Sequence, residues 1–250
     1  MNGWQKLKWF VLSGITESIG EVPVNRLSSP KVTPTQAAPQ PVAPDQSALT
    51  EQAKQVAEKA TTLADLYAIR EAFDGCPLKK TAGHTLNGRG AETPLVLCLV
   101  EAPDTADERD GQLVSGEAGV LFDKMLSAIG LSLAQNTYVA GLIPWRPPGN
   151  RKPTELESAI CAPFWKREID LLKPKCILLF GAGVSEAVLG LNALSKARGK
   201  WHDYNGIPVR ATLALGTLMK MPAQKKLAWE DLKQVRTLLD GLNTPTAPNE

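Results

Sequence analysis

The chain has 250 residues, of which 43% are hydrophobic and 22% charged, a composition typical of a globular protein with one or two domains. Wholesale disorder, a collagen-like fibre and a coiled coil are thereby excluded. Because 28 basic residues face 26 acidic ones, the formal net charge is only +2, which excludes a strongly basic nucleic-acid coat but not a local basic groove.

The N-terminal region divides into two segments of different composition. Residues 1–27 contain an apolar run, WFVLSGI, that is too short for a membrane span and predicts a small amphipathic helix able to dock a protein partner. Residues 28–48 are rich in Pro and Ala, and cannot bury enough surface to offset their ordering entropy, so they are predicted to be a flexible linker. Four scattered cysteines predict no disulfide scaffold, and together with the missing membrane span they indicate a cytoplasmic protein.

Residues 49–242 are predicted to form one domain, with a disordered tail at 243–250. Helical spacing of apolar residues predicts a first helix over roughly 47–73. Short apolar runs then alternate with helical patterns. Strands are predicted at 94–101, 137–143, 175–180 and 207–213, and helices at 117–130, 153–172, 181–189 and 222–242. This alternation predicts an α/β fold, a three-layer α/β/α sandwich with a central four-stranded, mostly parallel sheet. Such sheets bind ligands beyond the carboxyl ends of their strands.

The loops after these strands carry a series of motifs in one register. Glu101-Ala102-Pro103 follows the first strand, and the acid pair Asp107-Glu108 and a glycine-rich stretch, 111–119, come next. PWRPPGNR, residues 144–151, follows the second strand. The later motifs are Arg198-Gly199-Lys200-Trp201 and the set Pro222, Lys225, Trp229, Asp231 and Leu232. Over roughly 75–240 this series resembles the family-4 uracil-DNA glycosylases, and in particular a bacterial branch with the PWRPPGNR loop.

The resemblance implies DNA as the partner, and hydrolysis of the N-glycosidic bond of uracil or another damaged base as the reaction. It assigns catalytic roles to Glu101, as a water-activating carboxylate, and to Asp107. Two structural alternatives stay open: Glu101 can equally cap a helix N-terminus, and Asp107 can belong to a solvated acidic turn.

The departures from the family pattern fall on the pocket that would hold the base. Val114 stands where the family has a stacking Phe, after Leu113 in place of Pro. Gly141 replaces the Asn that reads the base edge, and Ala214 replaces the His that polarises the leaving base. We therefore expect weak, altered or lost activity. The alternative is a non-catalytic module that binds DNA or a protein. A generic nucleotide-binding role ranks last, because the third glycine that Gly181-Ala182-Gly183 would need is Glu186.

Several basic or polar residues are candidates for contacts with DNA phosphates. They are Arg146, Asn150, Arg151, Arg198, Lys200, Lys220 and Lys225. For the PWRPPGNR loop the alternative is a rigid proline turn with surface arginines. Leu218 and Met219, flanked by lysines, would form a wedge between bases, or else simply begin a helix.

No metal or cofactor is expected. The family often binds an iron–sulfur cluster through four cysteines, of which Cys76 and Cys161 match, whereas Phe73 and Trp145 occupy the other two positions. The only histidines, His84 and His202, match no family position and are expected to be surface or structural residues.

Overall fold

The computed structural model describes residues 46–243, which lie within one compact unit, Ala43–Glu250. The predicted leader, the linker up to residue 45 and residues 244–250 lie outside this range. The last three residues predicted as linker are helical instead, because helix α2 begins at Gln46.

The α/β fold is confirmed, but within residues 46–243 its sheet has six strands instead of the predicted four. The strands are β1 (Arg89–Gly90), β2 (Val96–Val100), β3 (Thr137–Gly141), β4 (Cys176–Phe180), β5 (Trp201–Tyr204) and β6 (Ile207–Thr212). Their order is β1-β3-β2-β4-β6-β5, with the four predicted strands parallel at the centre and β1 and β5 antiparallel at the edges. In the middle strands β2, β3 and β4 every residue is buried, which explains their uninterrupted apolar sequences.

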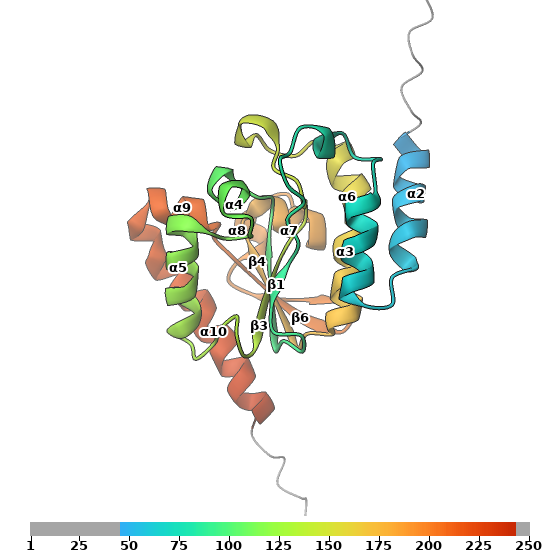
Figure 1. Ribbon diagram of the computed structural model, residues 1–250. Helices are drawn as coiled ribbons and strands as arrows, with labels where there is room; N and C mark the ends of the chain where they lie inside the picture. Colours follow the sequence, from blue (N-terminus) through green and yellow to red (C-terminus); the bar gives the residue numbers. More distant parts are fainter. Residues whose placement is uncertain (1–45, 244–250) are drawn as a thin grey trace, which may run out of the picture. The chain divides into compact units, whose positions relative to one another are not determined.

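Helices cover both faces of the sheet (Figure 1). One layer contains α2 (Gln46–Glu58), α3 (Leu63–Ala72), α6 (Glu155–Leu172), α7 (Ala182–Leu189) and α8 (Leu194–Ala197). The other contains α5 (Gly116–Ser127), α9 (Leu215–Lys220) and α10 (Lys225–Asn243). The short helix α4 is Thr105–Asp110, and 3-10 turns lie at Pro77–Lys80, Pro148–Asn150 and Pro222–Gln224. Among residues 46–243, no helix combines the length and apolar character that a membrane span requires.

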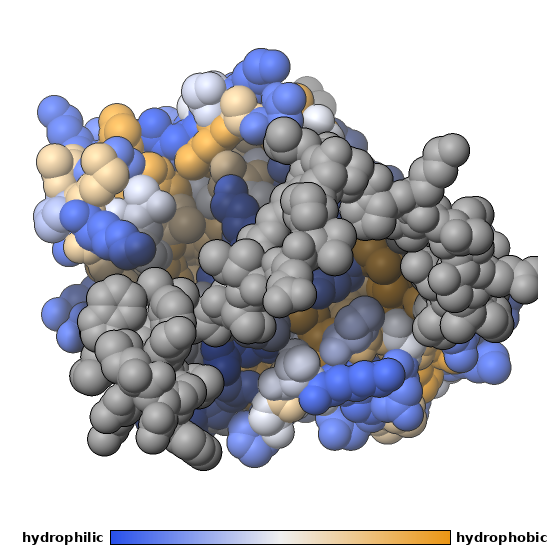
Figure 2. Space-filling view, turned by 90° about the horizontal axis from the view of Figure 1, so that it is seen from above, coloured by the Kyte–Doolittle hydropathy of each residue, from blue (hydrophilic) through white to orange (hydrophobic). Residues whose placement is uncertain are grey.

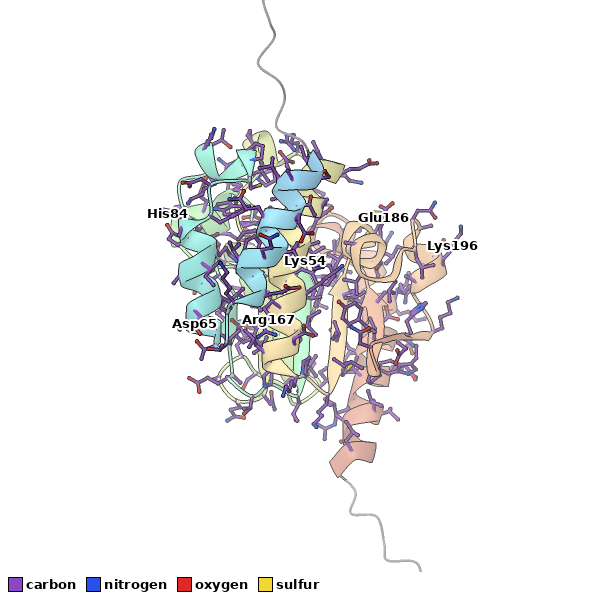
Figure 3. The ribbon with its side chains drawn as sticks, turned by 90° about the vertical axis from the view of Figure 1, so that its right-hand side faces the viewer. Lys54, Asp65, His84, Arg167, Glu186 and Lys196 are labelled. Atoms are coloured by element: carbon purple, nitrogen blue, oxygen red, sulfur yellow. The ribbon has the colours of Figure 1, made fainter. Side chains whose placement is uncertain are left out.

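The single helix predicted over 47–73 is wrong. The chain leaves the helical conformation after α2 and begins again at Thr62, whose side chain accepts a hydrogen bond from the Asp65 backbone while the Asp65 carboxylate accepts one from Thr62 N–H. Arg167 on α6 donates two hydrogen bonds, of 2.9 and 2.6 Å, to the Ala60 carbonyl at this break. Figure 3 shows α2 and α6 side by side, and it labels Arg167 of α6.

Among residues 46–243, two buried ionic clusters hold helices in place. Glu168 on α6 lies 2.8 Å from the Arg70 guanidinium on α3, and both side chains are almost fully buried. On the other face, the fully buried Asp231 of α10 contacts Arg198 and Arg210 at 2.6 and 3.2 Å. Both clusters join segments that are far apart in the sequence.

Candidate functional site

A cavity of about 590 Å³ lies where β2 and β4 end. Its wall combines residues from the loops after three strands, with Glu101 and Asp107 after β2, Phe180 at the end of β4, and Ala214 after β6. In Figure 1 this carboxyl edge of the sheet is at the top, beside α4. Figure 2 views the molecule from above, and apolar side chains are visible there among hydrophilic ones. The predicted location at the strand ends therefore coincides with a real cavity.

Of the three positions at which the sequence predicts changed pocket residues, two, Val114 and Ala214, line this cavity. Gly141 lies one strand away, paired with the cavity residue Val100. A Cβ built on Gly141 would lie 3.0 Å from the Ile143 carbonyl oxygen and 3.6 Å from both Leu113 methyl groups. The Ile143 carbonyl oxygen is therefore the tight contact, and the buried Leu113 side chain lies at ordinary contact distance, so a longer side chain such as asparagine would meet both.

The turn that carries Val114 is strained. Val114 has φ +56°, a left-handed conformation that is a genuine outlier for a β-branched residue. Arg89 holds the turn, since its guanidinium donates hydrogen bonds to the carbonyls of Leu113 and Val114 at 2.8 and 3.0 Å. Strain of this kind gathers at binding sites, where surrounding structure enforces it.

Gly119 allows α5 to approach this turn, and replacing it should disturb the cavity wall. A Cβ at Gly119 would lie 2.6 Å from the Val114 carbonyl oxygen, so Gly119→Ala is expected to cost about 1–3 kcal/mol of unfolding free energy. Gly241→Ala is the matched control, because its Cβ would meet nothing within 4 Å and should instead stabilise α10 by about 0.5–1 kcal/mol. Urea denaturation of both variants measures the two changes in unfolding free energy. Equal changes would contradict a close contact between Gly119 and the Val114 turn.

The acidic loop after β2 is organised rather than simply solvated. The buried Asp107 carboxylate accepts hydrogen bonds from the backbone N–H groups of Ser115 and Asp104, at 2.7 and 3.3 Å, and so joins α4 to the start of α5. The expectation of a solvated turn is therefore wrong for Asp107. The half-buried Glu101 lies against the first turn of α7, where its carboxylate occupies the space that a Cβ at Gly183 would need.

Asp107 should make stability depend on pH in a specific direction. Burial raises the pKa of its carboxyl above the ordinary 3.8, although two N–H groups partly oppose this. A raised pKa means that folding favours the protonated form, so this contribution is fully present below 3.8 and is lost as the pH rises through the folded-state pKa. Between about pH 7 and pH 4, the natural chain should gain stability relative to Asp107→Asn. Unfolding free energies of both proteins across this interval test this, and a constant difference would contradict it.

The residues predicted to contact DNA phosphates are largely engaged within the protein. Arg146 pairs with Glu108 at 2.5 Å, Asn150 bonds Thr105, and Arg151 makes a bidentate pair with Glu157 at 2.6 and 2.8 Å. These bonds attach the PWRPPGNR loop to α4 and α6, as in the alternative interpretation of a rigid turn.

The remaining candidates separate into one structural residue and three exposed lysines. Arg198 donates to Asp231 and to the Leu227 carbonyl, which makes it part of the buried cluster around α10. Lys200, Lys220 and Lys225 are exposed, and Lys220 lines the cavity. The wedge prediction is wrong for Leu218, which is fully buried, whereas Met219 is partly exposed.

The four positions related to the iron–sulfur ligands lie in the core. Phe73 packs edge to face on Phe164 with ring centroids 5.3 Å apart, and Trp145 donates a hydrogen bond to Thr85. The hydrogen bond between the thiols of Cys76 and Cys161 lowers the pKa of Cys76 and raises that of Cys161. Two thiols and two aromatic rings do not supply the ligands of a four-thiolate cluster. Within residues 46–243, no three His, Cys, Asp or Glu side chains gather into a metal site.

The two histidines lie away from the cavity wall. His84 is exposed on the loop before β1, on the opposite side of Figure 3 from Glu186. The His202 ring nitrogen Nε2 contacts the Ala197 carbonyl oxygen at 2.7 Å, which links β5 to α8.

Three residues of this site escaped sequence reasoning: Arg89, Ser115 and Phe180. Phe180 could have been found, since it is the last residue of a buried strand and directly precedes Gly181. Arg89 carried no such signal, because its partners are carbonyl groups 24 and 25 residues away.

Comparison with known proteins identifies the family. Residues 88–233, which include all six strands and the cavity, match the sequence model of the uracil DNA glycosylase superfamily. The type-4 uracil-DNA glycosylase of Sulfurisphaera tokodaii is 28% identical over 173 residues, covering 65% of this chain and 78% of that protein. The type-4 enzyme of Saccharolobus solfataricus is 27% identical over 174 residues, 66% and 80% of the two chains. A DNA polymerase of Bacillus phage SP01 is 24% identical over 164 residues, covering 66% of this chain and 18% of the polymerase. The chain belongs to the uracil-DNA glycosylase superfamily.

Proposed function

We propose that this chain acts on DNA as a base-excision-repair protein whose excision of uracil is weak or lost. One observation carries the proposal, namely that the cavity wall has alkyl groups at Val114 and Ala214. Neither can stack on a base or donate a hydrogen bond to it. Uracil leaves its sugar as an anion, and an enzyme accelerates this step through donors aimed at the developing charge.

The charges around the cavity also oppose an anionic leaving group. Among the described residues, four carboxylates line it, those of Glu101, Asp104, Asp107 and Glu117, against one ammonium group, that of Lys220. Negative charge that develops between carboxylates is disfavoured. DNA as partner is supported by the type-4 glycosylases and by the DNA polymerase that contains a similar segment. Because all four cysteines are buried and free, they agree with the cytoplasmic location that we include in the proposal.

Restoring the family residues tests this function. Because a longer side chain at Gly141 would meet Leu113, the restored chain carries Leu113→Pro with Val114→Phe, Gly141→Asn and Ala214→His. One donor of this kind is worth about 10²–10³ in rate, so the restored chain should excise uracil at least about 100-fold faster than the natural one. Single-turnover release of uracil from a duplex measures the excision rates of the natural and the restored chain. A type-4 uracil-DNA glycosylase, assayed in parallel, gives the reference rate. Excision by the natural chain at the type-4 rate would overturn the proposal.

A non-catalytic DNA-binding or partner-binding module is the second candidate. Glu101 favours it, since its carboxylate packs on the first turn of α7 as a helix-terminal acid would. In this case the chain binds DNA in a salt-sensitive manner but yields no abasic product with any damaged base.

Residues 1–27 would then dock the protein partner. Deleting them should weaken capture of that partner and leave DNA binding unchanged.

A further inference from the structure

We infer that the cavity accepts a cationic base, an N-alkylated purine, in place of uracil. This inference rests on the proposed function, because it assumes that the cavity receives a base everted from DNA. It identifies which class of base the remaining side chains can bind and release.

An aromatic ring and an excess of carboxylates favour a cationic ligand. Phe180 is 3% exposed and is one of the residues that line the cavity, and its ring packs edge to face with Phe122 with the centroids 5.6 Å apart. Aromatic rings attract cations through their quadrupole, and the attraction grows in a desolvated site. Glu101, half-buried at the end of β2, supplies a carboxylate on the same wall. Among the described lining residues, Lys220, Asp104 and Glu117 are all exposed, so solvent screens their charges, and the less exposed carboxylates of Glu101 and Asp107 dominate the wall.

A hydroxyl group lies on the same wall of the cavity. Ser115 is only 5% exposed, and its side chain interacts with the carboxylates of Asp107 and Asp110, whose pKa it acts to lower. Because Ser115 also lines the cavity, its hydroxyl can donate to or accept from the polar edge of a base. The volume of about 590 Å³ lies within the range of small-molecule sites and admits a two-ring base.

The chemistry of an alkylated purine explains how excision could proceed without the missing histidine. Alkylation at N7 or N3 makes the base cationic. When the bond between C1′ and N9 breaks, both bonding electrons go to N9, and the base leaves as a neutral molecule. Water then adds to the cationic C1′ and gives its proton to the Glu101 carboxylate, which returns it to solvent. Because no anion forms on the base, a donor at Ala214 is unnecessary.

Binding of free nucleosides tests recognition. The full-length chain is titrated at pH 6 with cationic N7-methylguanosine and with guanosine, its neutral counterpart. We expect the cation to bind about 10-fold more tightly or better, and Glu101→Gln and Phe180→Leu each to reduce this preference. Glu155→Gln on α6, an exposed carboxylate outside the cavity, is the control and should keep the full preference. Thermal melting confirms that each variant is folded. Equal binding of the two nucleosides, or an unchanged preference in Glu101→Gln, would overturn the inference.

Release of the base from DNA tests the reaction. A duplex that contains N7-methylguanine should lose it faster with the natural chain than in buffer, and Glu101→Gln should slow this release by about 10²-fold, as expected for loss of a general base. Failure to release the methylated base overturns the excision step. The uracil assay separates the two proposals: type-4 rates on uracil contradict the proposed function, whereas no uracil excision and no preference for the cation contradict only this inference.

Discussion

Replacing Asp231 by alanine is expected to lower the free energy of unfolding by about 3–5 kcal/mol, because it leaves a buried guanidinium without its counter-charge. Asp231 accepts hydrogen bonds from Arg198, Arg210 and Thr212, at 2.6, 3.2 and 3.0 Å. Arg210 is itself buried, and its Nε has no partner among the described residues, so it depends strongly on this carboxylate.

Glu230→Gln on the same helix is the control for Asp231→Ala. Glu230 pairs with Lys233, but both side chains are about half exposed, and such surface pairs contribute about 0–1 kcal/mol. Urea denaturation of the two variants gives the comparison, provided that the m-value is unchanged. A loss below about 1 kcal/mol in Asp231→Ala would show that the cluster does not stabilise α10 as described.

The second large effect is expected at Glu168. Its carboxylate accepts hydrogen bonds from Arg70 at 2.8 Å and from Tyr67 at 3.0 Å, while the hydroxyl of Tyr67 also contacts that of Tyr138. Glu168→Gln removes the charge but nearly preserves the shape, and it leaves the Arg70 guanidinium, 2% exposed, unpaired in the core. We expect a loss of about 3–5 kcal/mol.

A double-mutant cycle distinguishes the charge from the packing in this cluster. The double variant Arg70→Met, Glu168→Gln contains no unpaired charge and should lose less stability than Glu168→Gln alone. Asp74→Asn is the surface control, because Asp74 pairs with Lys79 but is 83% exposed and should change stability by less than about 1 kcal/mol. Additive effects of Arg70→Met and Glu168→Gln would contradict a coupled ion pair.

These clusters change the interpretation of the Arg198-Gly199-Lys200-Trp201 motif. The sequence presents Arg198 as a DNA-binding candidate, but in the fold its guanidinium binds Asp231, 33 residues further along the chain. Trp201 stacks near the other arginine of this cluster, with the Arg210 guanidinium 5.6 Å from its ring centroid. In this part of the motif, Arg198 and Trp201 stabilise the contact between α10 and the sheet.

Local sequence signals account for both the successes and the errors in predicting the fold. The central strands were predictable because burial on both faces requires continuous apolar runs. Strand β5 was missed because its sequence, WHDY, is only partly buried, although Asn205-Gly206 is a strong hairpin signal and both residues have positive φ. The break between α2 and α3 was missed because apolar spacing continues across it, while the capping pair Thr62 and Asp65 starts the second helix.

The sequence by itself determined the α/β class, the family and the strand-end position of the cavity, because runs, caps and motifs are properties of neighbouring residues. Only the tertiary structure decided what surrounds the residues at the strand ends. It placed Leu113 against Gly141, engaged the arginines of the PWRPPGNR loop with Glu108 and Glu157, and brought Phe180 and Ser115 to the cavity wall. Such contacts join residues that are distant along the chain, and close packing settles them only when the helices meet the sheet.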